Sequence, residues 1–505
     1  MSREDGCDRT SIDERARRIT NDHVGRQQLN KRFDHAKREA EIYDKWEADG
    51  AFRPSGEGEP FFIPMPPPNI TGRLHMGHAL FSTIQDAMIR HARMSGRDAL
   101  WLPGVDHAGM ATQAKLDAEM IEAGLDPAGP DFEAFSARYR SRLGSEIEDQ
   151  LRRTGASCDW SRRRYTMDEA YSRSVEAAFA ICRERDMLYR HEGDWYLRMD
   201  DLAARMLAEI DAGRLTIRPE GGEGVLREFL SNIEPWCISR NIRWGHRIPI
   251  EGETAVLDTW FSSALWPFAT LGWPEDTPDM RRYYPAALIE TGDDILFFWC
   301  ARMLMMGLLL TDRLCFDTIL LHGIVRDEQG RKMSKSLGNG IDPLGLIDEH
   351  GCDAMRMSLL EGSAPDQDLR IRKDRLQAGR GFMTKIWNVA RFALPRMEEG
   401  HAIDHPDDLE ILARAETACL EIGSGIASFE THLAAAAARR FLFDDMSSWW
   451  IERSKERIFA GDPSAASCLH RTMDALLRMT HPLTPFVTEE IRSHMGGPPL
   501  ITSRW

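Results

Sequence analysis

The chain has 505 residues, of which 42% are hydrophobic and 29% are charged, proportions that are ordinary for a globular protein with several domains. No apolar run is long enough to span a membrane, and residues 1–18 lack the apolar core of a signal peptide, so we expect a cytoplasmic protein without membrane contact. The net charge of −16 argues against non-specific binding of nucleic acids, although it leaves room for a local basic groove.

The first predicted elements alternate between helix and strand. Residues 1–50 are charged and have a helical pattern, and Ile42, Trp46 and Phe52 are placed to dock the end of this segment on a core. Residues 61–63 form a predicted buried strand, the prolines of 64–68 stop it, and a helix is predicted over 75–93. A second strand over 99–102 is followed by a loop and another helix. Such alternation indicates a parallel α/β sheet, in which ligands bind at the carboxyl ends of the strands.

The rest of the chain adds a second α/β portion and a helical end. Residues 130–215 are predicted to be mostly helical, residues 255–345 return to strands and helices, and the apolar stretch 295–310 indicates a buried helix. Beyond about residue 348 the strand signals fade. We therefore predict an α/β fold with a Rossmann-type parallel-sheet domain, split by a short helical connective insertion and followed by an all-α helix bundle. The predicted boundaries are 1–50 for an N-terminal helical segment, 51–170 and 255–345 for the two halves of the sheet domain, 171–254 for the connective segment, 346–396 for a linker and 397–505 for the bundle.

The motif NITGRLHMGH, residues 69–78, places two histidines at the start of a helix. His75 and His78 are three residues apart and share a helix face, and Gly77 lets a ligand approach the backbone closely. The N–H groups and the positive dipole end of a helix N-terminus suit a phosphate, to which two imidazoles can also donate hydrogen bonds. Metal binding is the alternative, but no third ligand lies near in the sequence and the nine cysteines contain no C-x-x-C pair, so we expect no metal site and no zinc.

The pentapeptide KMSKS, residues 332–336, lies in the glycine-containing run DEQGRKMSKSLGNGIDP. Two lysines around a small hydroxyl residue suit a loop that closes on a phosphate. A solvated surface loop is the simpler alternative, and the pentapeptide alone favours that alternative. Its combination with HMGH and the preceding PPPN, however, is a strong signal for the phosphate-binding reading.

The chain resembles the class I aminoacyl-tRNA synthetases, and within them most closely the valyl-tRNA synthetases, from about Phe33 to Trp505. The resemblance rests on eight motifs in order: PPPNITGRLHMGH, GVDHAGMATQ, WSRRRYTMDE, WCISRNIRWGHRIP, LDTWFSSALWPFATLGWPE, TGDDILFFWCARM, GIVRDEQGRKMSKSLGN and HPLTPFVTEEI. It implies that the carboxylate of an amino acid attacks the α-phosphorus of ATP, which arrives with Mg²⁺, to give an aminoacyl-adenylate and pyrophosphate. The acyl group then passes to the terminal ribose of a tRNA such as tRNA-Val. The sheet domain would be catalytic, residues 346–396 would contact the tRNA stem, the bundle would bind the anticodon, and we expect a monomer.

The resemblance also implies roles for single residues. The catalytic candidates are Lys332 and Lys335, which would meet charge on the reacting phosphate, and His75 and His78, which would bind phosphate and adenosine. The ATP site would further include Thr71, Gly77, Gly292, Asp294 and Ser334, with Lys335 shared between the two sets.

The implied amino-acid pocket combines a carboxylate with apolar walls. Asp106 would accept the α-ammonium group with the help of the Pro67 carbonyl, and Asn69 would border the same site. Trp260, Ile295 and Trp299 would enclose a branched aliphatic side chain. The simpler alternatives are core packing for the tryptophans and a capping role for Asp106.

The sequence departs from the valyl pattern in several places. We expect the large editing domain to be missing at a junction near residues 191–194 and the C-terminal coiled-coil arm to be absent, and the zinc-binding piece is reduced to IEGETAV. In the stretch ETGDD, Glu290 and Asp293 add two carboxylates beside the ATP site. We therefore expect a shortened paralogue that lacks post-transfer editing.

A basic stretch is the expected tRNA contact. Residues 372–396 hold seven Arg or Lys against one acid, with Trp387 and Phe392 between them. A solvated helix face is the alternative. The candidates for tRNA binding are Arg372, Lys373, Arg375, Arg380, Lys385 and Arg391.

Three functions remain open at this point: a ligase that charges tRNA with valine or a close aliphatic analogue, an adenylating enzyme of a specialised pathway with a non-tRNA acceptor, and a non-catalytic paralogue. The intact lysines and histidines argue against the third. The helix bundle favours the first over the second.

Overall fold

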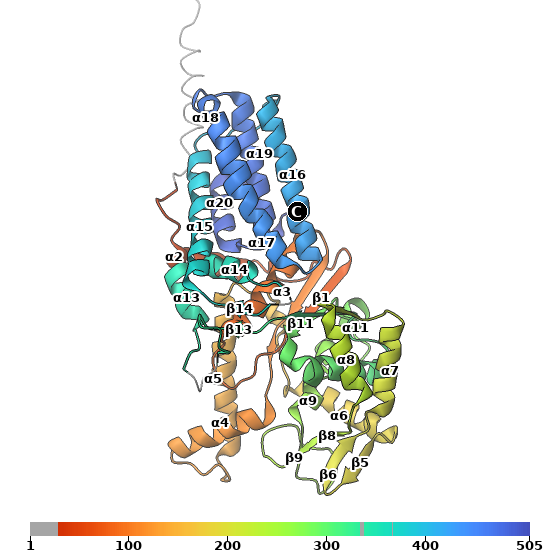
Figure 1. The fold of residues 1–505 in the computed structure, drawn as a ribbon. Helices are drawn as coiled ribbons and strands as arrows, with labels where there is room; N and C mark the ends of the chain where they lie inside the picture. Colours follow the sequence, from red (N-terminus) through yellow and green to blue (C-terminus); the bar gives the residue numbers. More distant parts are fainter. Residues whose placement is uncertain (1–28, 334–337, 366) are drawn as a thin grey trace, which may run out of the picture.

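The computed structural model describes residues 29–333, 338–365 and 367–505, so the predictions for Ser334, Lys335 and residues 1–28 fall outside it. Figure 1 shows an elongated molecule with a helix bundle at one end, a parallel sheet in the middle and a small antiparallel sheet with its helices at the other end. The predicted fold class, an α/β domain followed by a helix bundle, is confirmed.

The central sheet is assembled from both halves of the α/β region. β1 (Pro60–Pro64) runs parallel to β2 (Asp98–Leu102), and β11 (Ile289–Gly292) runs parallel to β12 (Thr318–His322), which also pairs with β7 (Thr216–Arg218). The N–H of Ala287, just before β11, donates to the carbonyl of Phe62 in β1 at 2.8 Å and joins the two ladders. β7 lies within the predicted connective segment 171–254, so this part of the segment belongs to the sheet. The pairing joins residues about a hundred positions apart, which local patterns do not reveal.

The sheet is buried on both faces, as parallel sheets are when helices cover them. Phe62 and Leu100 lie in one hydrophobic cluster, whereas Ile63 and Trp101 lie in another. The helix α3 (Met76–Met94) packs on β1, β2 and β11. The strands predicted over 61–63 and 99–102 and the helix predicted over 75–93 are therefore confirmed within a residue or two.

A smaller region of helices and short strands connects the two halves. Its elements are β3 (Gly104–Val105), α4 (Gly109–Glu122), α5 (Phe132–Arg153), η1 (Trp160–Arg162), β4 (Arg164–Tyr165), α6 (Glu169–Glu184), β5 (Leu188–His191), β6 (Asp194–Leu197), α7 (Asp200–Asp211), α8 (Gly221–Ser231), β8 (Trp236–Cys237), β9 (Ser239–Arg240) and β10 (Val256–Leu257). β5, β6 and β8 form an antiparallel sheet. Glu192 (φ 50°) and Gly193 (φ 94°) both have positive φ, the geometry of a tight two-residue hairpin turn between β5 and β6. This hairpin interrupts the stretch that was predicted to be mostly helical.

The second half continues into the linker region. Its further elements are α9 (Thr259–Ser263), α10 (Trp266–Ala269), α11 (Pro278–Tyr283), η2 (Asp293–Ile295), the π-helical turn η3 (Leu296–Ala301), α12 (Arg302–Thr311), β13 (Val325–Arg326), α13 (Pro343–His350), α14 (Cys352–Leu360), β14 (Leu369–Arg370) and α15 (Lys373–Ala393). Among the described residues, the continuous helical stretch Asp293–Thr311 is long and apolar enough to cross a membrane by length and composition. Most of it is buried inside the protein, as in the core helices of soluble proteins that share this composition.

The bundle consists of α16 (Pro406–Ala427), α17 (Thr431–Arg440), the π-helical η4 (Phe441–Ile451), α18 (Glu452–Phe459), α19 (Pro463–Thr480), α20 (Pro485–Met495) and η5 (Leu500–Thr502), with α2 (His35–Ala48) packed on α20. A fully buried group of charges anchors it to the sheet domain. Asp86 of α3 accepts from Arg90 Nε and pairs with Arg356 Nη2 of α14, both at 2.7 Å. Burial would raise the pKa of Asp86, but the two arginines lower it. Arg356 also donates to the carbonyl of Pro482, between α19 and α20, at 2.9 Å.

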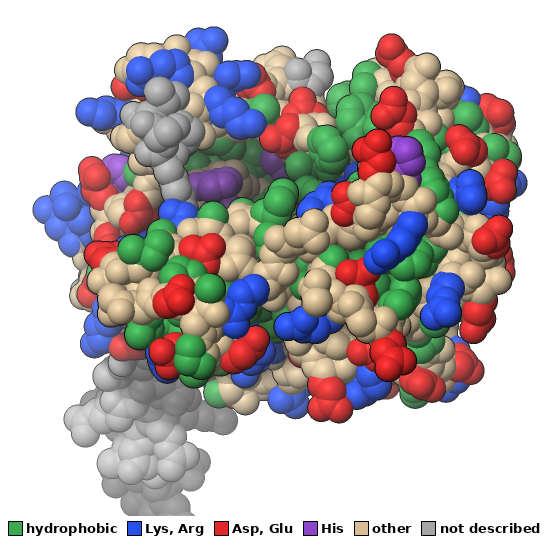
Figure 2. Space-filling model, turned by 90° about the horizontal axis from the view of Figure 1, so that it is seen from below, with side chains coloured by type: hydrophobic (Ala, Val, Ile, Leu, Met, Phe, Trp, Pro, Cys, Tyr) green, Lys and Arg blue, Asp and Glu red, His purple; other side chains and the backbone are tan. Residues whose placement is uncertain are grey.

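The surface does not carry one sign of charge throughout. On the face shown in Figure 2, acidic and basic side chains are interspersed, and histidine side chains lie in a hollow. The acidic net charge therefore leaves basic side chains available for anionic partners.

Candidate functional site

The two histidines of the HMGH motif cap the helix that they begin. His75 is the N-cap of α3, and its Nδ1 accepts from the Gly77 N–H at 3.1 Å. The Nδ1 of His78 accepts from the His75 N–H at 3.2 Å, which completes a capping box. The ring centroids are 3.9 Å apart, so the predicted shared face is confirmed. Because each Nδ1 is an acceptor, a neutral imidazole at either position carries its proton on Nε2.

Gly77 has a second reason to be glycine. A Cβ built at this position would lie 2.9 Å from Cε1 of His75. A side chain at residue 77 would therefore displace the imidazole of His75, whether or not a ligand is bound. One of the N–H groups expected to face a phosphate, that of Gly77, is already used by His75.

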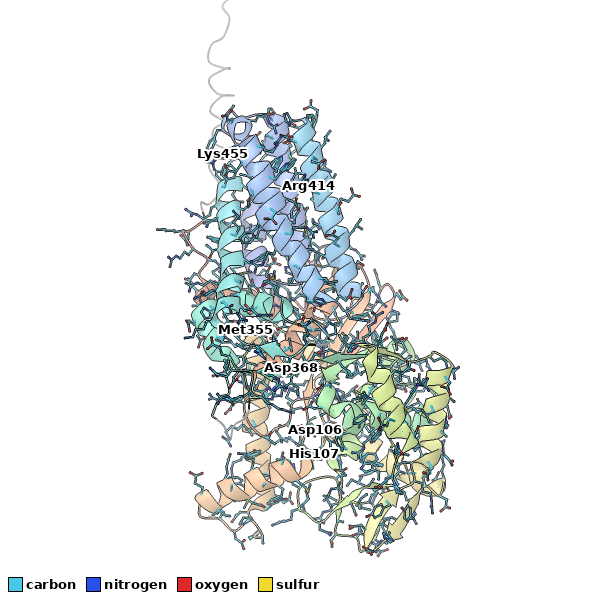
Figure 3. The ribbon with its side chains drawn as sticks, in the orientation of Figure 1. Asp106, His107, Met355, Asp368, Arg414 and Lys455 are labelled. Carbon is cyan, nitrogen blue, oxygen red and sulfur yellow. The ribbon has the colours of Figure 1, made fainter. Side chains whose placement is uncertain are left out.

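Asp106 lies in a buried cluster of hydroxyl groups directly after β3. It is 4% exposed, and its carboxylate accepts from the Ala108 N–H at 2.7 Å, from Thr259 Oγ1 at 3.1 Å and from Ser263 Oγ. Burial raises the pKa of Asp106, while these hydrogen bonds oppose the shift. Figure 3 places Asp106 and His107 between the sheet domain and the connective region, away from the bundle.

A cavity of about 290 Å³ opens beside this carboxylate. Its wall includes the predicted residues Asn69, Asp106 and Trp260. Sequence reasoning missed three more lining side chains, Arg240, Thr259 and Ser263, although each stands in a motif that carries the resemblance. Thr259 and Ser263 could have been found from the sequence, because they are hydroxyl residues close to Trp260 on either side.

The other predicted pocket residues lie around this cavity. Trp299 is buried and donates from Nε1 to the Ser263 carbonyl at 3.2 Å, and Ile295 is partly buried one turn earlier in the same helical stretch. Trp260 stacks on the half-exposed Phe298 with ring centroids 6.2 Å apart. Pro67 is partly exposed. The N–H of Asp106 donates to the carbonyl of the next residue, Pro68, at 2.9 Å.

His107 and His246 form a buried neutral pair behind Asp106. Burial lowers the pKa of each imidazole to about 3, so both are neutral at physiological pH. Nδ1 of His107 lies 2.7 Å from Thr166 Oγ1, and Nε2 of His246 contacts the carbonyl of the same residue at 2.5 Å. Neutral rings add no positive charge beside the Asp106 carboxylate.

The first lysine of KMSKS reaches across to the start of η2. Nζ of Lys332 lies 3.1 Å from Oδ2 of Asp294, and both side chains are at least half exposed. Oδ1 of Asp294 lies 2.9 Å from the point that a Cβ on Gly292 would occupy, so Gly292 makes room for this carboxylate. The structure thus brings Lys332, Asp294 and Gly292 together. Thr71 is partly exposed in the turn before His75, with its N–H donating to the Asn69 carbonyl at 2.7 Å.

The base of the KMSKS loop is held by Asp327, which the sequence analysis did not single out. Its carboxylate accepts from the N–H and Nε of Arg331, each at 2.8 Å, and from Nδ2 of Asn339 at 2.8 Å. The hydrogen bond from Asn339, followed by those from Arg331, lowers the pKa of Asp327 to about 2. Asp327 therefore stays ionised and fastens both ends of the loop.

The two carboxylates of ETGDD have different positions. Asp293 is exposed at the start of η2, whereas Glu290 is fully buried in β11. Oε2 of Glu290 accepts from Gln85 of α3 at 2.8 Å, and its Oε1 lies 3.5 Å from Nε2 of His322. Nδ1 of His322 donates to the Gly323 carbonyl, 3.0 Å away, which leaves Nε2 facing Oε1 of Glu290. Burial raises the pKa of Glu290, whereas His322 and the hydrogen bond from Gln85 oppose the shift.

The predicted tRNA contacts on α15 do not form one continuous face. Lys373, Arg380 and Arg391 recur at helical spacing and share an exposed face. Lys385 lies on another side of the helix, 5.7 Å from the ring of Phe443.

The two remaining candidates at the start of α15 are already engaged. Arg372 pairs with Asp374 at 2.5 Å. Arg375 is partly buried, and its guanidinium occupies the space that a side chain at Gly362 would need. These two arginines are therefore less available to a nucleic acid than the three on the exposed face.

Known proteins match nearly the whole chain. The family described as "tRNA synthetases class I (I, L, M and V)" matches residues 41–193, 188–251 and 250–372, and the "Anticodon-binding domain of tRNA ligase" matches residues 408–505. A valine–tRNA ligase of Geobacter sulfurreducens is 30% identical over 705 aligned positions, which cover 94% of this chain and 79% of the relative. The chloroplastic/mitochondrial valine–tRNA ligase 2 of Arabidopsis thaliana is 30% identical, covering 92% and 73%.

Solved structures share the fold at low identity. The agnB2 LeuRS of Agrobacterium radiobacter K84, in a ternary complex with tRNA and LeuAMS, matches with a TM-score of 0.80 and 14% identity, covering 94% of this chain and 90% of the other. The methionyl-tRNA synthetase of Mycobacterium tuberculosis, bound to methionyl-adenylate, matches with a TM-score of 0.74 and 20% identity, covering 86% and 93%. These likenesses establish the arrangement of a class I sheet domain and bundle.

Proposed function

The chain belongs to the class I tRNA synthetases and is an aminoacyl-tRNA ligase, and we propose that it activates valine or a close aliphatic analogue with ATP and transfers it to a tRNA. The observation that carries this proposal is the position of Lys332. Its Nζ meets Asp294 at the start of the helical stretch that continues to Trp299, which hydrogen-bonds to the wall of the Asp106 cavity. One helix thus connects a cation suited to phosphate with a pocket suited to an amino acid.

The proposed reaction assigns each group a step. The carboxylate of the amino acid attacks the α-phosphorus of ATP, the bond to the β-phosphate oxygen breaks, and pyrophosphate leaves with that electron pair. Lys332, together with Lys335, which lies outside the described residues, would stabilise the charge that grows on the phosphates. The Nε2–H groups of His75 and His78 are suited to donate to phosphate oxygens. We expect Mg²⁺ to arrive as part of the ATP substrate.

Asp106 is the proposed partner of the α-ammonium group. Its acceptors already receive one N–H and two hydroxyl hydrogen bonds, which fix the carboxylate in place before the substrate arrives. Trp260 and Trp299 supply apolar surface beside it. Valine as the substrate is supported by the names of relatives that are about 30% identical over more than 90% of this chain.

We also propose that the chain lacks an editing domain. The two-residue turn at Glu192 and Gly193 leaves no inserted domain between β5 and β6. The family match breaks at residues 188–193 and again at 250–251, the two places where sequence reasoning expected losses. The alignment with the Geobacter relative spans 705 positions but covers 94% of the 505 residues here, about 475, so about 230 positions of that alignment have no residue in this chain.

The decisive experiment is amino-acid-dependent exchange of labelled pyrophosphate into ATP, followed by acylation of tRNA. Exchange with valine and formation of valyl-tRNA would support the whole proposal. Exchange without acylation of any tRNA would point to a non-tRNA acceptor, and absence of exchange with every aliphatic amino acid would contradict the proposal. We also expect a cytoplasmic protein and a monomer, and sedimentation of the purified protein would test the oligomeric state.

A further inference from the structure

A second cavity, of about 430 Å³, adjoins the cavity beside Asp106. It lies between the end of α8, β8 and one face of η3 and α12, on which Phe298, Arg302 and Met305 recur at helical spacing. The side chain of Arg240 lines both cavities. The proposed reaction uses none of these groups, so the second cavity needs an explanation of its own.

Arg302 is a mostly buried cation that donates no hydrogen bond to a described residue. Its side chain is 16% exposed, and burial lowers its pKa only to about 10, so it stays charged at neutral pH. Its one ion pair in residues 29–333, 338–365 and 367–505 is with Asp258, whose Oδ2 lies 3.8 Å from Nη1, too far for a hydrogen bond. A guanidinium has five N–H donors, and proteins rarely leave buried donors unused.

Asp258 is already engaged by other donors. Its Oδ2 accepts from Nε1 of Trp236 at 2.9 Å and lies 3.2 Å from Nη2 of Arg240. Arg240 in turn donates to the carbonyls of Cys237 and Ser239, at 3.0 and 2.7 Å. One carboxylate therefore serves two guanidinium groups, and the buried part of the wall keeps one positive charge in excess.

Aromatic side chains hold Arg302 in place and form much of the remaining wall. The guanidinium carbon lies 4.0 Å from the ring centroid of Trp236 and 5.6 Å from that of Phe298. Phe229 adds apolar surface, whereas Glu234, the one acid on the wall, is exposed. A cavity of this size, with apolar walls and one buried cation in excess, fits a small organic anion.

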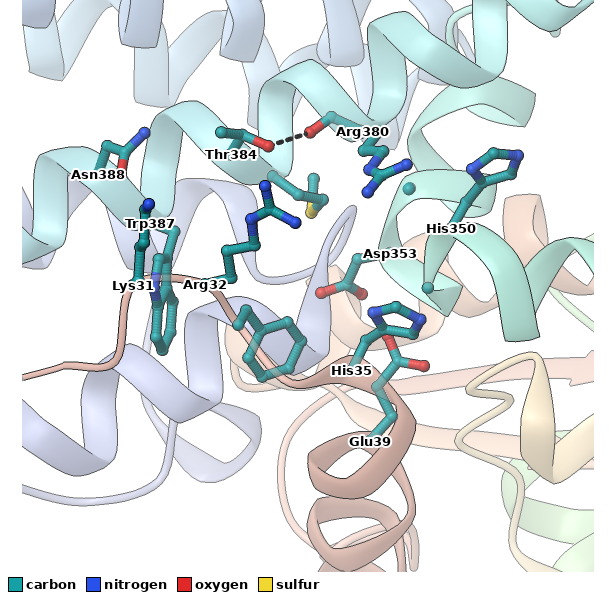
Figure 4. Close-up of a pocket in the computed structure, with 14 residues that line it drawn as sticks. Lys31, Arg32, His35, Glu39, His350, Asp353, Arg380, Thr384, Trp387 and Asn388 are labelled. Atoms are coloured by element: carbon teal, nitrogen blue, oxygen red, sulfur yellow. Dashed lines mark hydrogen bonds between the residues drawn. The ribbon is translucent and has the colours of Figure 1, made fainter.

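Other arginines that line a cavity are exposed to water. Figure 4 shows a cavity of about 380 Å³ between the residues that lead into α2, the junction of α13 and α14, and the middle of α15, and Arg32 and Arg380 line it. Both of these side chains are exposed, so water satisfies their donors without a ligand. Arg302 has little such access, and a ligand in its cavity would supply the acceptor that it lacks.

We propose that the second cavity binds a small aromatic carboxylate, whose two oxygens accept paired hydrogen bonds from Arg302. The planar fork of a guanidinium matches the spacing of carboxylate oxygens. Phe298 lines the cavity and is 50% exposed, so a ring bound beside it would cover apolar surface that now faces water. Binding itself needs no assumption about the reaction that the protein catalyses.

Occupancy of this cavity should be transmitted to the amino-acid pocket, and this second step rests on the proposed function. Phe298 stacks on Trp260, with ring centroids 6.2 Å apart, and Trp260 lines the Asp106 cavity. A ligand that immobilises Phe298 also limits the motion of Trp260, so valine would meet a wall that is already ordered. We expect the KM for valine to fall about fivefold when the second cavity is filled, the lower end of typical couplings between sites.

The test is calorimetric titration of the full chain with 3-phenylpropionate, and with the neutral 3-phenylpropionamide as the matched ligand. The acid should bind at least about tenfold more tightly than the amide, because a charged hydrogen-bonded pair is lost with the amide. Arg302→Gln should remove this preference, and its urea unfolding midpoint shows whether the fold is intact; Asp258 keeps Trp236 and Arg240 as partners. Arg183→Gln, on an exposed arginine of α6 without an ion pair among the described residues, is the control and should bind like the parent.

Phe298→Ala gives a second and independent variant. Because Phe298 is half exposed, the fold should tolerate its removal, and the variant should bind the acid and the amide equally less well. It should also abolish the effect of the acid on the KM for valine in pyrophosphate exchange, because the contact with Trp260 is gone.

The outcomes separate the site from the reaction. Equal affinity of the parent for acid and amide, or a preference for the acid that persists in Arg302→Gln, would overturn the proposed site. A KM for valine that the acid leaves unchanged would overturn the coupling. A parent that binds the acid through Arg302 but exchanges pyrophosphate with no aliphatic amino acid would support the site and contradict the proposed function.

Discussion

At the scale of the residue, the site depends on side chains that are held before substrate arrives. Asp106 is fixed by three donors, His75 and His78 are fixed by the backbone of α3, and Lys332 rests on Asp294. The ion pair of Lys332 is exposed, and such pairs contribute about 0–1 kcal/mol to stability. Its value to the protein is therefore expected in catalysis and not in folding.

Lys332→Ala should reduce pyrophosphate exchange by about 100- to 1000-fold, the scale for removing one group that stabilises transition-state charge, while the unfolding midpoint hardly changes. Lys45→Ala is a matched control, because Lys45 also forms an exposed ion pair, with Asp49 at 2.7 Å, but lies on α2. Exchange and urea unfolding of both variants give the comparison. A folded Lys332→Ala protein that exchanges at the parent's rate would exclude the assigned role.

At the scale of the element, buried carboxylates connect helices end to end. Glu39 of α2 caps α14, and Asp353 of α14 caps α20, so α2, the linker region and the bundle are joined through two helix N-termini. Burial raises the pKa of Asp353 to about 6, even though Val487 and Arg356 oppose the shift. The folded protein therefore holds a proton on Asp353 at a pH at which the unfolded chain, with a carboxyl pKa of about 4, has released it.

The free energy of unfolding should fall as the pH rises from about 4 to about 6 because of this group, by about 3 kcal/mol at most. Asp353→Asn stays neutral, so the difference in stability between variant and parent should grow across this window and then level off above it. Urea unfolding at intervals between pH 4 and pH 8 measures this difference. A difference that is the same at every pH would mean that Asp353 does not titrate in this window.

At the scale of the whole molecule, a sheet domain and a helix bundle pack against each other, and no large insertion separates β5 from β6. The buried group of Asp86, Arg90 and Arg356 ties α3 to α14 and to the loop between α19 and α20. At the opposite end, β5 and β6 close in a tight turn. The molecule thus keeps the parts expected to charge a tRNA, and the two-residue turn at this hairpin agrees with the proposal that the chain lacks an editing domain.

Threonine should therefore be activated detectably, at about one hundredth of the efficiency of valine, because an apolar pocket discriminates weakly against an isostere with an added hydroxyl. Threonyl-tRNA, once formed, should persist. The measurement is the deacylation of preformed threonyl-tRNA with and without the enzyme, with valyl-tRNA as the control for spontaneous hydrolysis.

Two results would count against this expectation. Fast enzyme-dependent hydrolysis of threonyl-tRNA would reveal an editing site elsewhere in the chain. Rejection of threonine at activation by far more than about 100-fold would mean that a polar group in the cavity beside Asp106 discriminates against the threonine hydroxyl. Thr259 and Ser263 would then be the first residues to examine, since their hydroxyls line this cavity.

The sequence by itself determined the first two strands of the sheet domain, the helix between them and the helical end of the chain. The strands at 61–63 and 99–102, the helix after His75 and the helical end of the chain follow from local periodicity and from proline positions, which act within a few residues. The shared face of His75 and His78 follows from helix geometry alone.

Only the tertiary structure decided which distant residues meet. The contacts of Asp106 with Thr259 and Ser263, of Lys332 with Asp294, and of Arg32 and Arg380 with one cavity all join residues at least 38 positions apart. The burial of Glu290 and the entry of β7 into the sheet were likewise hidden, because burial and strand pairing depend on what the rest of the chain places against a segment. Local sequence patterns determine which face of each helix or strand is apolar, whereas the packing of those faces determines which distant residues come into contact.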